Sequence, residues 1–204
     1  MIISVDHIAM SSLNIEKDLQ NTESRGYSCL FREKLSNLKI KEQFLSKWQD
    51  WHILAFCENK SGYNIELLNH GQITENKGYI EFIKNNEVMI KTPNTSKSMI
   101  LWESLGFKKV SGNRLVFSSF FAKTPLYITI AETKDIPERQ LDDFGCNCMG
   151  FITSSITDRY TKLKQICNRI TDIGELCVNG KNMKIFFAQY NNNEIIEIIE
   201  IIKK

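Results

Sequence analysis

The chain has no long apolar run. None of its 204 residues belongs to a stretch approaching the roughly 18 apolar residues that mark a membrane-spanning helix. The N-terminus also lacks a basic region followed by a long apolar stretch, which is the pattern of a secretory signal. We therefore expect a cytoplasmic protein with no membrane partner.

Charge of one sign is not in large excess either. The formal net charge is +2, and the lysines are spread among acidic residues. The chain therefore offers no basic stripe to hold a phosphate backbone, which argues against a nucleic-acid partner. Hydrophobic residues make up 42% of the sequence, enough for a globular core.

Several common site motifs are also missing. The six cysteines show no disulfide-framework spacing, so we expect most of them to be reduced thiols. There is no glycine-rich phosphate loop, serine nucleophile elbow or zinc-finger spacing. These absences argue against nucleotide-binding loops, serine hydrolases and small zinc domains.

What the chain does contain is one supersecondary pattern, repeated three times. The clearest copy begins at Glu87 and predicts a strand, a turn, a helix ending at Gly106 and a second strand. His7 precedes Gly26 by the same number of positions as Glu87 precedes Gly106. A looser third copy begins at Cys148. The repetition predicts three unequal copies of one unit.

Each copy continues into further strands, so the predicted unit is strand, helix and three strands. Residues 33–47 are either a long loop or an inserted helix, and the pattern leaves both open. The link at 71–86 is expected to contain a helical turn or two. The predicted strands lie at 2–10, 27–32, 51–57, 63–69, 88–91, 107–110, 114–120, 126–132, 184–190 and 194–201.

Four segments carry a resemblance to a known family: DHIAMSSLNIEK, YNIELLNHG, IKTPNTSKSMILWESLGFKKV and the closing YNNNEIIEII. In this order they resemble the vicinal oxygen chelate superfamily, which includes glyoxalase I, methylmalonyl-CoA epimerase, extradiol dioxygenases and bleomycin resistance proteins. The resemblance covers nearly the whole chain. The link after YNIELL is similar to that of the epimerases, whereas the closing segment lacks the Asp-Pro-Gly that often precedes the family's final glutamate.

The resemblance implies an α+β fold of three glyoxalase-like βαβββ modules, in which paired modules form curved-sheet cups. The short connector between the second and third modules predicts a two-module domain at 87–204, with 1–86 as a single module and its link. An unpaired module would expose an apolar sheet face. We therefore expect module one to pair with its copy in a homodimer, or to cover its own C-terminal domain.

The resemblance also implies metal ligands on the first and last strands of each module. His7 and Glu66 stand at these positions in module one, each among apolar residues on its strand face. An imidazole and a carboxylate on adjacent strands suit half a site for Zn, Ni, Co or Mn, which a twofold copy would complete. A hydrogen-bonded His and Glu pair without metal is the alternative.

In the other two modules the corresponding positions hold a poorer ligand set. Glu87 and Cys148 stand on the first strands, and Glu132 and Glu197 stand on the last ones. Glu197 has an isoleucine two positions away on either side, which predicts an inward carboxylate neutralised by a metal, a cation or a proton. Glu194 is expected to be solvated. The candidate metal ligands are His7, Glu66, Glu87 and Glu197.

Two functions from different classes follow. One is a metal-dependent isomerase or lyase, in which Glu66 or Glu197 is the catalytic base that moves a proton next to the carbonyl of a small acyl or oxo substrate. The other is a metal-free protein of the bleomycin resistance type, which only binds or sequesters a small molecule. No histidine follows His70, so the predicted 87–204 cup cannot hold the two-histidine iron site of extradiol dioxygenases.

Overall fold

The computed structural model describes residues 1–204 except 61–62, 85, 122–123, 135, 192 and 203–204. Three modules follow one another along the chain, and each has a strand, a helix and further strands, as the repetition predicts. The side chains of Asn14, Asn94 and Ser155 accept a hydrogen bond from the third backbone N–H that follows, which caps the helix of each module. None of the helices within the described ranges is long and apolar enough to span a membrane.

Module one and the link fill the first part of the chain. A 3₁₀ helix, η1, lies between its second and third strands, so the polar segment left open by the sequence contains an inserted helical turn. The link forms strand β6 where a helical turn was expected. The elements are β1 (Ile2–Ser11), α1 (Ile15–Glu23), β2 (Ser28–Ser36), η1 (Lys39–Phe44), β3 (Trp51–Glu58), β4 (Asn64–Asn69), β5 (Thr74–Lys77) and β6 (Ile80–Lys84).

Modules two and three follow, and the predicted ranges of β10 and β15 agree with the structure. Module two contains β7 (Glu87–Thr92), α2 (Thr95–Ser104), β8 (Lys108–Ser111), β9 (Arg114–Phe117) and β10 (Leu126–Glu132). Module three contains β11 (Asp143–Thr153), α3 (Ile156–Lys164), β12 (Arg169–Ile170), β13 (Gly174–Val178), β14 (Lys181–Tyr190) and β15 (Glu194–Ile201).

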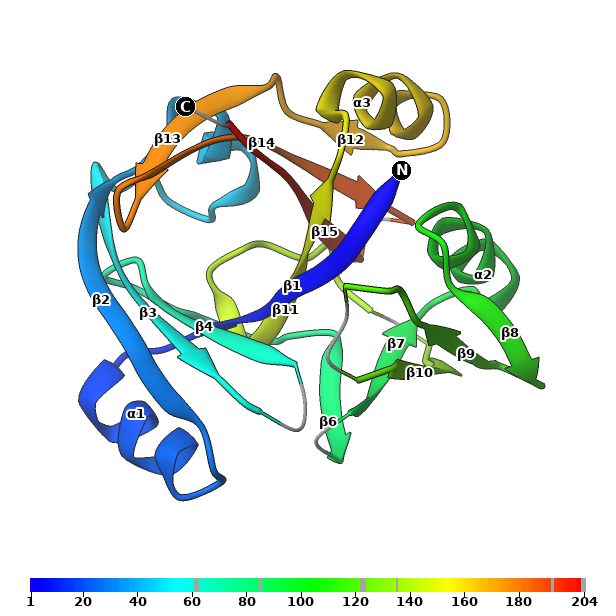
Figure 1. Ribbon diagram of the computed structural model, residues 1–204, viewed down its shortest axis with the longest axis horizontal. Coiled ribbons are helices and arrows are strands. Elements are labelled where there is room, and N and C mark those ends of the chain that lie inside the picture. Colours follow the sequence, from blue (N-terminus) through cyan, green and yellow to red (C-terminus); the bar gives the residue numbers. More distant parts are fainter. Residues whose placement is uncertain (61–62, 85, 122–123, 135, 192, 203–204) are drawn as a thin grey trace.

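The cup is formed by modules one and three, so the prediction that modules two and three pair with each other was wrong. β1 lies antiparallel to β11, with His7 opposite Gly150. The strands run β2, β3, β4, β1, β11, β15, β14 and β13 across the two modules (Figure 1). β6 explains the result, because it pairs with β7 and so occupies the edge through which module two would have joined another module.

The predicted fold class is confirmed: the chain is an α+β protein of three βαβββ-like modules, the third with the additional two-residue strand β12, and two of the modules form a curved cup. Module one is covered within its own chain, since its first strand is paired with β11. The argument for a homodimer from an unpaired module one therefore does not hold. Residues 87–204 likewise form no closed cup of their own.

Two hydrophobic cores lie on opposite faces of the cup. Successive residues of β11 alternate between them, with Cys148 on the inner face and Met149 and Phe151 in the outer core. Trp102 of α2 is fully buried in the outer core, with its ring 6.3 Å from that of Phe151. Module two is therefore packed against the outside of the cup, to the right of β11 in Figure 1.

A buried carboxyl group lies at this junction. Glu194 begins β15 and is fully buried, so the prediction that it is solvated was wrong. Its Oε1 accepts hydrogen bonds from Ser98 Oγ and, at 3.2 Å, from Trp102 Nε1. Its Oε2 has no partner in the described part of the chain. Burial raises the pKa of Glu194 to about 7, although the two hydrogen bonds oppose that shift.

Candidate metal centre

Three of the predicted site residues meet on the inner face of the cup. Glu66 lies on β4 beside Ala9, which is two residues along β1 from His7 and so shares its face. Glu197 lies on β15 beside Gly150, which is the residue opposite His7. The four central strands therefore bring one imidazole and two carboxylates to one place.

The distances within this group suit a shared ion. His7 Nε2 lies 3.3 Å from Glu66 Oε2 and 3.4 Å from Glu197 Oε2. The three potential ligand atoms all lie within 4.8 Å of one another, the only such group of three found among the described residues. We refer to His7, Glu66 and Glu197 as the triad.

The other nitrogen of His7 is fixed by its neighbour in sequence. His7 Nδ1 lies 2.9 Å from Asp6 Oδ2, so an Nδ1–H can donate to that carboxylate. This leaves Nε2 pointing at the two glutamates. Nε2 is nevertheless buried and makes no hydrogen bond to any described residue. Nε2 therefore lies at ion-pair distance from both carboxylates, and neither contact has the geometry of a regular hydrogen bond.

The charges of the triad affect one another. Burial lowers the pKa of His7, but the carboxylates of Glu66, Asp6 and Glu197 more than offset this and raise the pKa well above 6.5. Burial raises the pKa of Glu66, and the charge of Glu197 adds to that effect while His7 opposes it. In the metal-free protein a proton on His7 would therefore hold the two carboxylates together.

A glycine makes room for the imidazole. A Cβ built on Gly150 would lie 2.5 Å from Cε1 of His7 and 2.9 Å from Nε2. No side chain can therefore stand opposite His7 while the ring keeps this position. Gly150 was missed in the sequence, because its role depends on the β1 and β11 register.

The fourth position of the pattern holds a thiol. By the pairing of Glu66 with Ala9 and of Glu197 with Gly150, the residue of module three that corresponds to His7 is Cys148. Cys148 is buried opposite Ala9, and burial together with Glu197 and Glu66 raises its thiol pKa well above 9. It is thus a protonated neighbour of the triad.

Glu87 does not join the triad, because β7 belongs to the module that lies outside the cup. Its carboxylate accepts hydrogen bonds from Arg114 at 3.0 and 3.3 Å, and Lys84 Nζ lies 3.3 Å away. Burial acts to raise the pKa of Glu87, but the charges of Arg114 and Lys84 outweigh it and lower the pKa. The structure does not bring Glu87 to Glu197, with which the sequence grouped it in one cup. Glu132 accepts hydrogen bonds from Thr95 at the start of α2.

The triad opens into a cavity of about 240 Å³ inside the cup. Its walls are largely apolar, and Phe31 and Phe56 stack there with ring centroids 5.6 Å apart. Other apolar wall residues include Leu35, Leu54, Leu176, Met183 and Ile199. The arrangement can hold a divalent ion at one end and the apolar body of a small molecule beside it.

No protein-family model matches this chain, and no curated protein matches it in sequence. Solved structures do. They include a proposed dioxygenase from Bacillus subtilis (10% identity, TM-score 0.40, 98% of this chain and 63% of that one) and glyoxalase I from Zea mays (14% identity, TM-score 0.38, 98% and 68%). A Mn(II)-bound glyoxalase from Novosphingobium aromaticivorans also matches (14% identity, TM-score 0.27, 96% and 62%).

The chain thus spans less than two thirds of the length of the Bacillus protein. At these identities and TM-scores the matches carry no information about the reaction or the substrate of this chain. The fold is defined by the chain's own module order and strand pairing.

Proposed function

We propose that this protein is a metal-dependent isomerase or lyase that moves a proton next to the carbonyl group of a small acyl or oxo substrate. One observation carries the proposal. His7 Nε2 is buried and lies 3.3 and 3.4 Å from two glutamate oxygens, and the three potential ligand atoms lie within 4.8 Å of one another. A divalent cation bound by all three side chains would satisfy that nitrogen and neutralise both carboxylates.

The donor set fits Zn, Ni, Co or Mn, because one imidazole and two carboxylates are ligands that these ions accept. Asp6 would support the ion from outside, since a hydrogen bond from Nδ1–H to a carboxylate fixes the ring and makes Nε2 a better ligand. Three protein ligands leave positions open for a substrate oxygen. When bound, the metal supplies positive charge to that oxygen.

The chain's own residues would carry the proton. Glu66 is the proposed base, because its carboxylate lines the cavity beside His7. It takes the proton from the carbon next to the carbonyl and returns it to the same or the neighbouring carbon, so no other reagent is consumed. Glu197 has the mirrored position in module three and is the other candidate base. The wall around them is largely apolar.

Metal stoichiometry tests the centre directly. Protein purified without a metal-affinity tag and loaded with Zn or Mn should hold one ion per chain. His7→Ala, Glu66→Gln and Glu197→Gln should each abolish stoichiometric binding. Glu87→Gln is the matched control, because Glu87 is paired with Arg114 in the module outside the cup. Full occupancy in His7→Ala would sink the assignment.

Proton transfer is tested by exchange. Metal-loaded protein is mixed with pyruvate in D₂O, and loss of the methyl signal is followed by proton NMR. We expect wild-type protein to exchange the methyl protons faster than free metal does. Glu66→Gln and Glu197→Gln should lose the effect together with the metal. The absence of exchange with pyruvate and with other small oxo acids, in protein that holds its metal, would refute the enzymatic proposal.

A binding protein without catalysis is the second candidate. It is favoured by Cys148, a buried and protonated thiol at the place that corresponds to His7 in module three. A centre with one histidine is also a weaker ligand set than one with two. If wild-type protein binds neither Zn nor Mn, and small apolar molecules still bind in the cup, this candidate replaces the enzyme.

A further inference from the structure

A second polar group lies in the cup apart from the triad. It consists of Lys41 from η1, His52 from β3 and His70 just after β4, and we call it the basic corner. Lys41 and His52 line the same cavity as His7, Glu66 and Glu197. The rings of His52 and His70 lie 5.4 Å apart. Lys41 and His52 therefore face the same cavity as the triad, and His70 lies next to His52.

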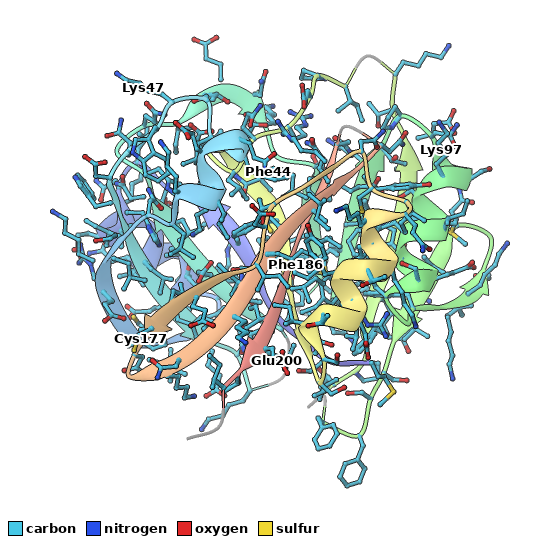
Figure 2. All side chains as sticks on the ribbon, turned by 90° about the horizontal axis from the view of Figure 1, so that it is seen from above. Phe44, Lys47, Lys97, Cys177, Phe186 and Glu200 are labelled. Atoms are coloured by element: carbon cyan, nitrogen blue, oxygen red, sulfur yellow. The ribbon has the colours of Figure 1, made fainter. Side chains whose placement is uncertain are left out.

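Lys41 is buried and forms no direct ion pair within the described ranges, although its charge acts on the carboxylate of Glu66. Only 6% of the residue is exposed. Among the described residues no carboxylate forms an ion pair with it, and the contact found for its ammonium group is the ring of Phe187, 5.4 Å from Nζ. Figure 2 shows Phe44, the last residue of η1, close to β14. A buried ammonium group without a direct ion pair is costly, since few groups replace the water it has lost.

The two histidines of the basic corner are neutral and unsatisfied. Burial and the charge of Lys41 lower the pKa of His52 to about 2 and that of His70 to about 3. A neutral imidazole keeps one N–H. Nδ1 of His52 and both nitrogens of His70 are buried without a hydrogen-bond partner in the described ranges. His70 therefore has an unpartnered N–H in either tautomer, and Nδ1 of His52 lacks a partner whether it donates or accepts.

We propose that the basic corner binds the carboxylate of a small organic acid, whose apolar body lies against Phe31 and Phe56. The proposal rests on the proposed function in one respect, because the other end of such an acid would reach the triad. A second metal ion is a poor occupant, because the ammonium group of Lys41 would repel it. One cation and neutral imidazoles suit a single negative charge. The cavity of about 240 Å³ is smaller than the usual range for drug-sized ligands, which favours a small acid.

Calorimetry with phenylacetate tests the proposal on the full chain, both loaded with Zn and stripped by a chelator. Phenylacetamide is the neutral isostere and phenyl phosphate the dianionic one. We expect phenylacetate to bind in both preparations. Phenylacetamide should bind about ten- to a hundred-fold more weakly, the usual effect of losing a charged hydrogen bond. Phenyl phosphate should not bind more tightly than phenylacetate.

Lys41→Met is the test variant and Lys39→Met its matched control. Lys39 stands in the same 3₁₀ helix, but its side chain is 73% exposed and pairs with Glu42. Lys41→Met should weaken phenylacetate binding about ten- to a hundred-fold, whereas Lys39→Met should leave it unchanged. The thermal midpoint of Lys41→Met without ligand should not fall below that of the wild type, because methionine fills the same space without a buried charge.

Three results would overturn the inference: no phenylacetate binding by wild-type protein, equal binding by Lys41→Met, or equal binding of the amide. Loss of metal binding is a separate outcome. If chelator-stripped protein binds phenylacetate through Lys41 but no variant or preparation holds metal, the carboxylate site stands and the proposed function falls.

Discussion

Gly150→Ala is the substitution that most directly tests how the metal centre is built. The added Cβ would lie 2.5 Å from Cε1 of His7 and 2.8 Å from Nδ1, where ordinary contacts begin at 3.4 Å. The ring, β11 or both must then move apart by about 1 Å, a displacement large enough to disturb a site held by precise contacts. Neither the three ligands nor Asp6 is altered in the variant.

The expected result is a loss of metal affinity with little loss of fold. Displacing His7 breaks its alignment with Asp6 and the two glutamates, so metal affinity measured by competition with a chromogenic chelator should fall about 10- to 100-fold. Overpacking should also lower the free energy of unfolding by about 1 to 3 kcal/mol, measured in urea.

A double-mutant cycle separates the imidazole from other causes. In a His7→Ala background the space next to Gly150 is empty, so adding Gly150→Ala should have almost no effect on stability. The reasoning is refuted if Gly150→Ala binds metal as tightly as the wild type, or if it destabilises the His7→Ala protein as much as the wild type.

Three further predictions concern stability and stoichiometry. The pKa of Glu194 is raised from 4.5 to about 7 in the folded state. The folded protein is therefore at its full stability below pH 4.5 and loses stability as the pH rises from 4.5 through 7. The free energy of unfolding of Glu194→Gln, relative to that of the wild type, should therefore rise by up to about 3 kcal/mol between pH 5 and pH 8. A difference that does not change with pH in chemical unfolding would contradict this. Phe151→Ala removes a fully buried ring that contacts Trp102, so it should cost about 3 to 5 kcal/mol, whereas Phe120→Ala, 96% exposed, should cost almost nothing. The triad comes from one chain, so metal stoichiometry should stay at one per chain on dilution, and sedimentation that shows metal loss with dissociation of a dimer would disagree.

The sequence predicted the three modules but not which of them pair. Turn signals and apolar runs placed β10 and β15, and strand alternation put His7, Glu66 and Glu197 on inward faces. The pairing of β1 with β11 is a contact between distant segments and leaves no local signal. The decisive element was β6, which covers the edge of β7 and which the sequence suggested as a helical turn.

The residues missed at the site share this cause. Lys41 lies in a polar segment whose structure the sequence left open, and nothing local shows that η1 places it inside the cup. Glu194 was expected in water because no local pattern reveals that α2 packs over the start of β15. Asp6 offered a usable signal, an acidic residue directly before a ligand histidine, yet its contact with Nδ1 depends on the side-chain geometry.

The placement of module two outside the cup has a consequence for folding kinetics. Two halves of one sheet are separated in sequence by a complete module, so the β1 and β11 contact closes a long loop and its formation carries a large entropic cost. Such non-local topologies fold slowly, and local modules are expected to form before their long-range contacts. His7 and Glu66 would meet Glu197 only when β15 docks, late in that sequence of events. Metal binding would therefore become possible only in the final folding step, when β15 pairs with β11.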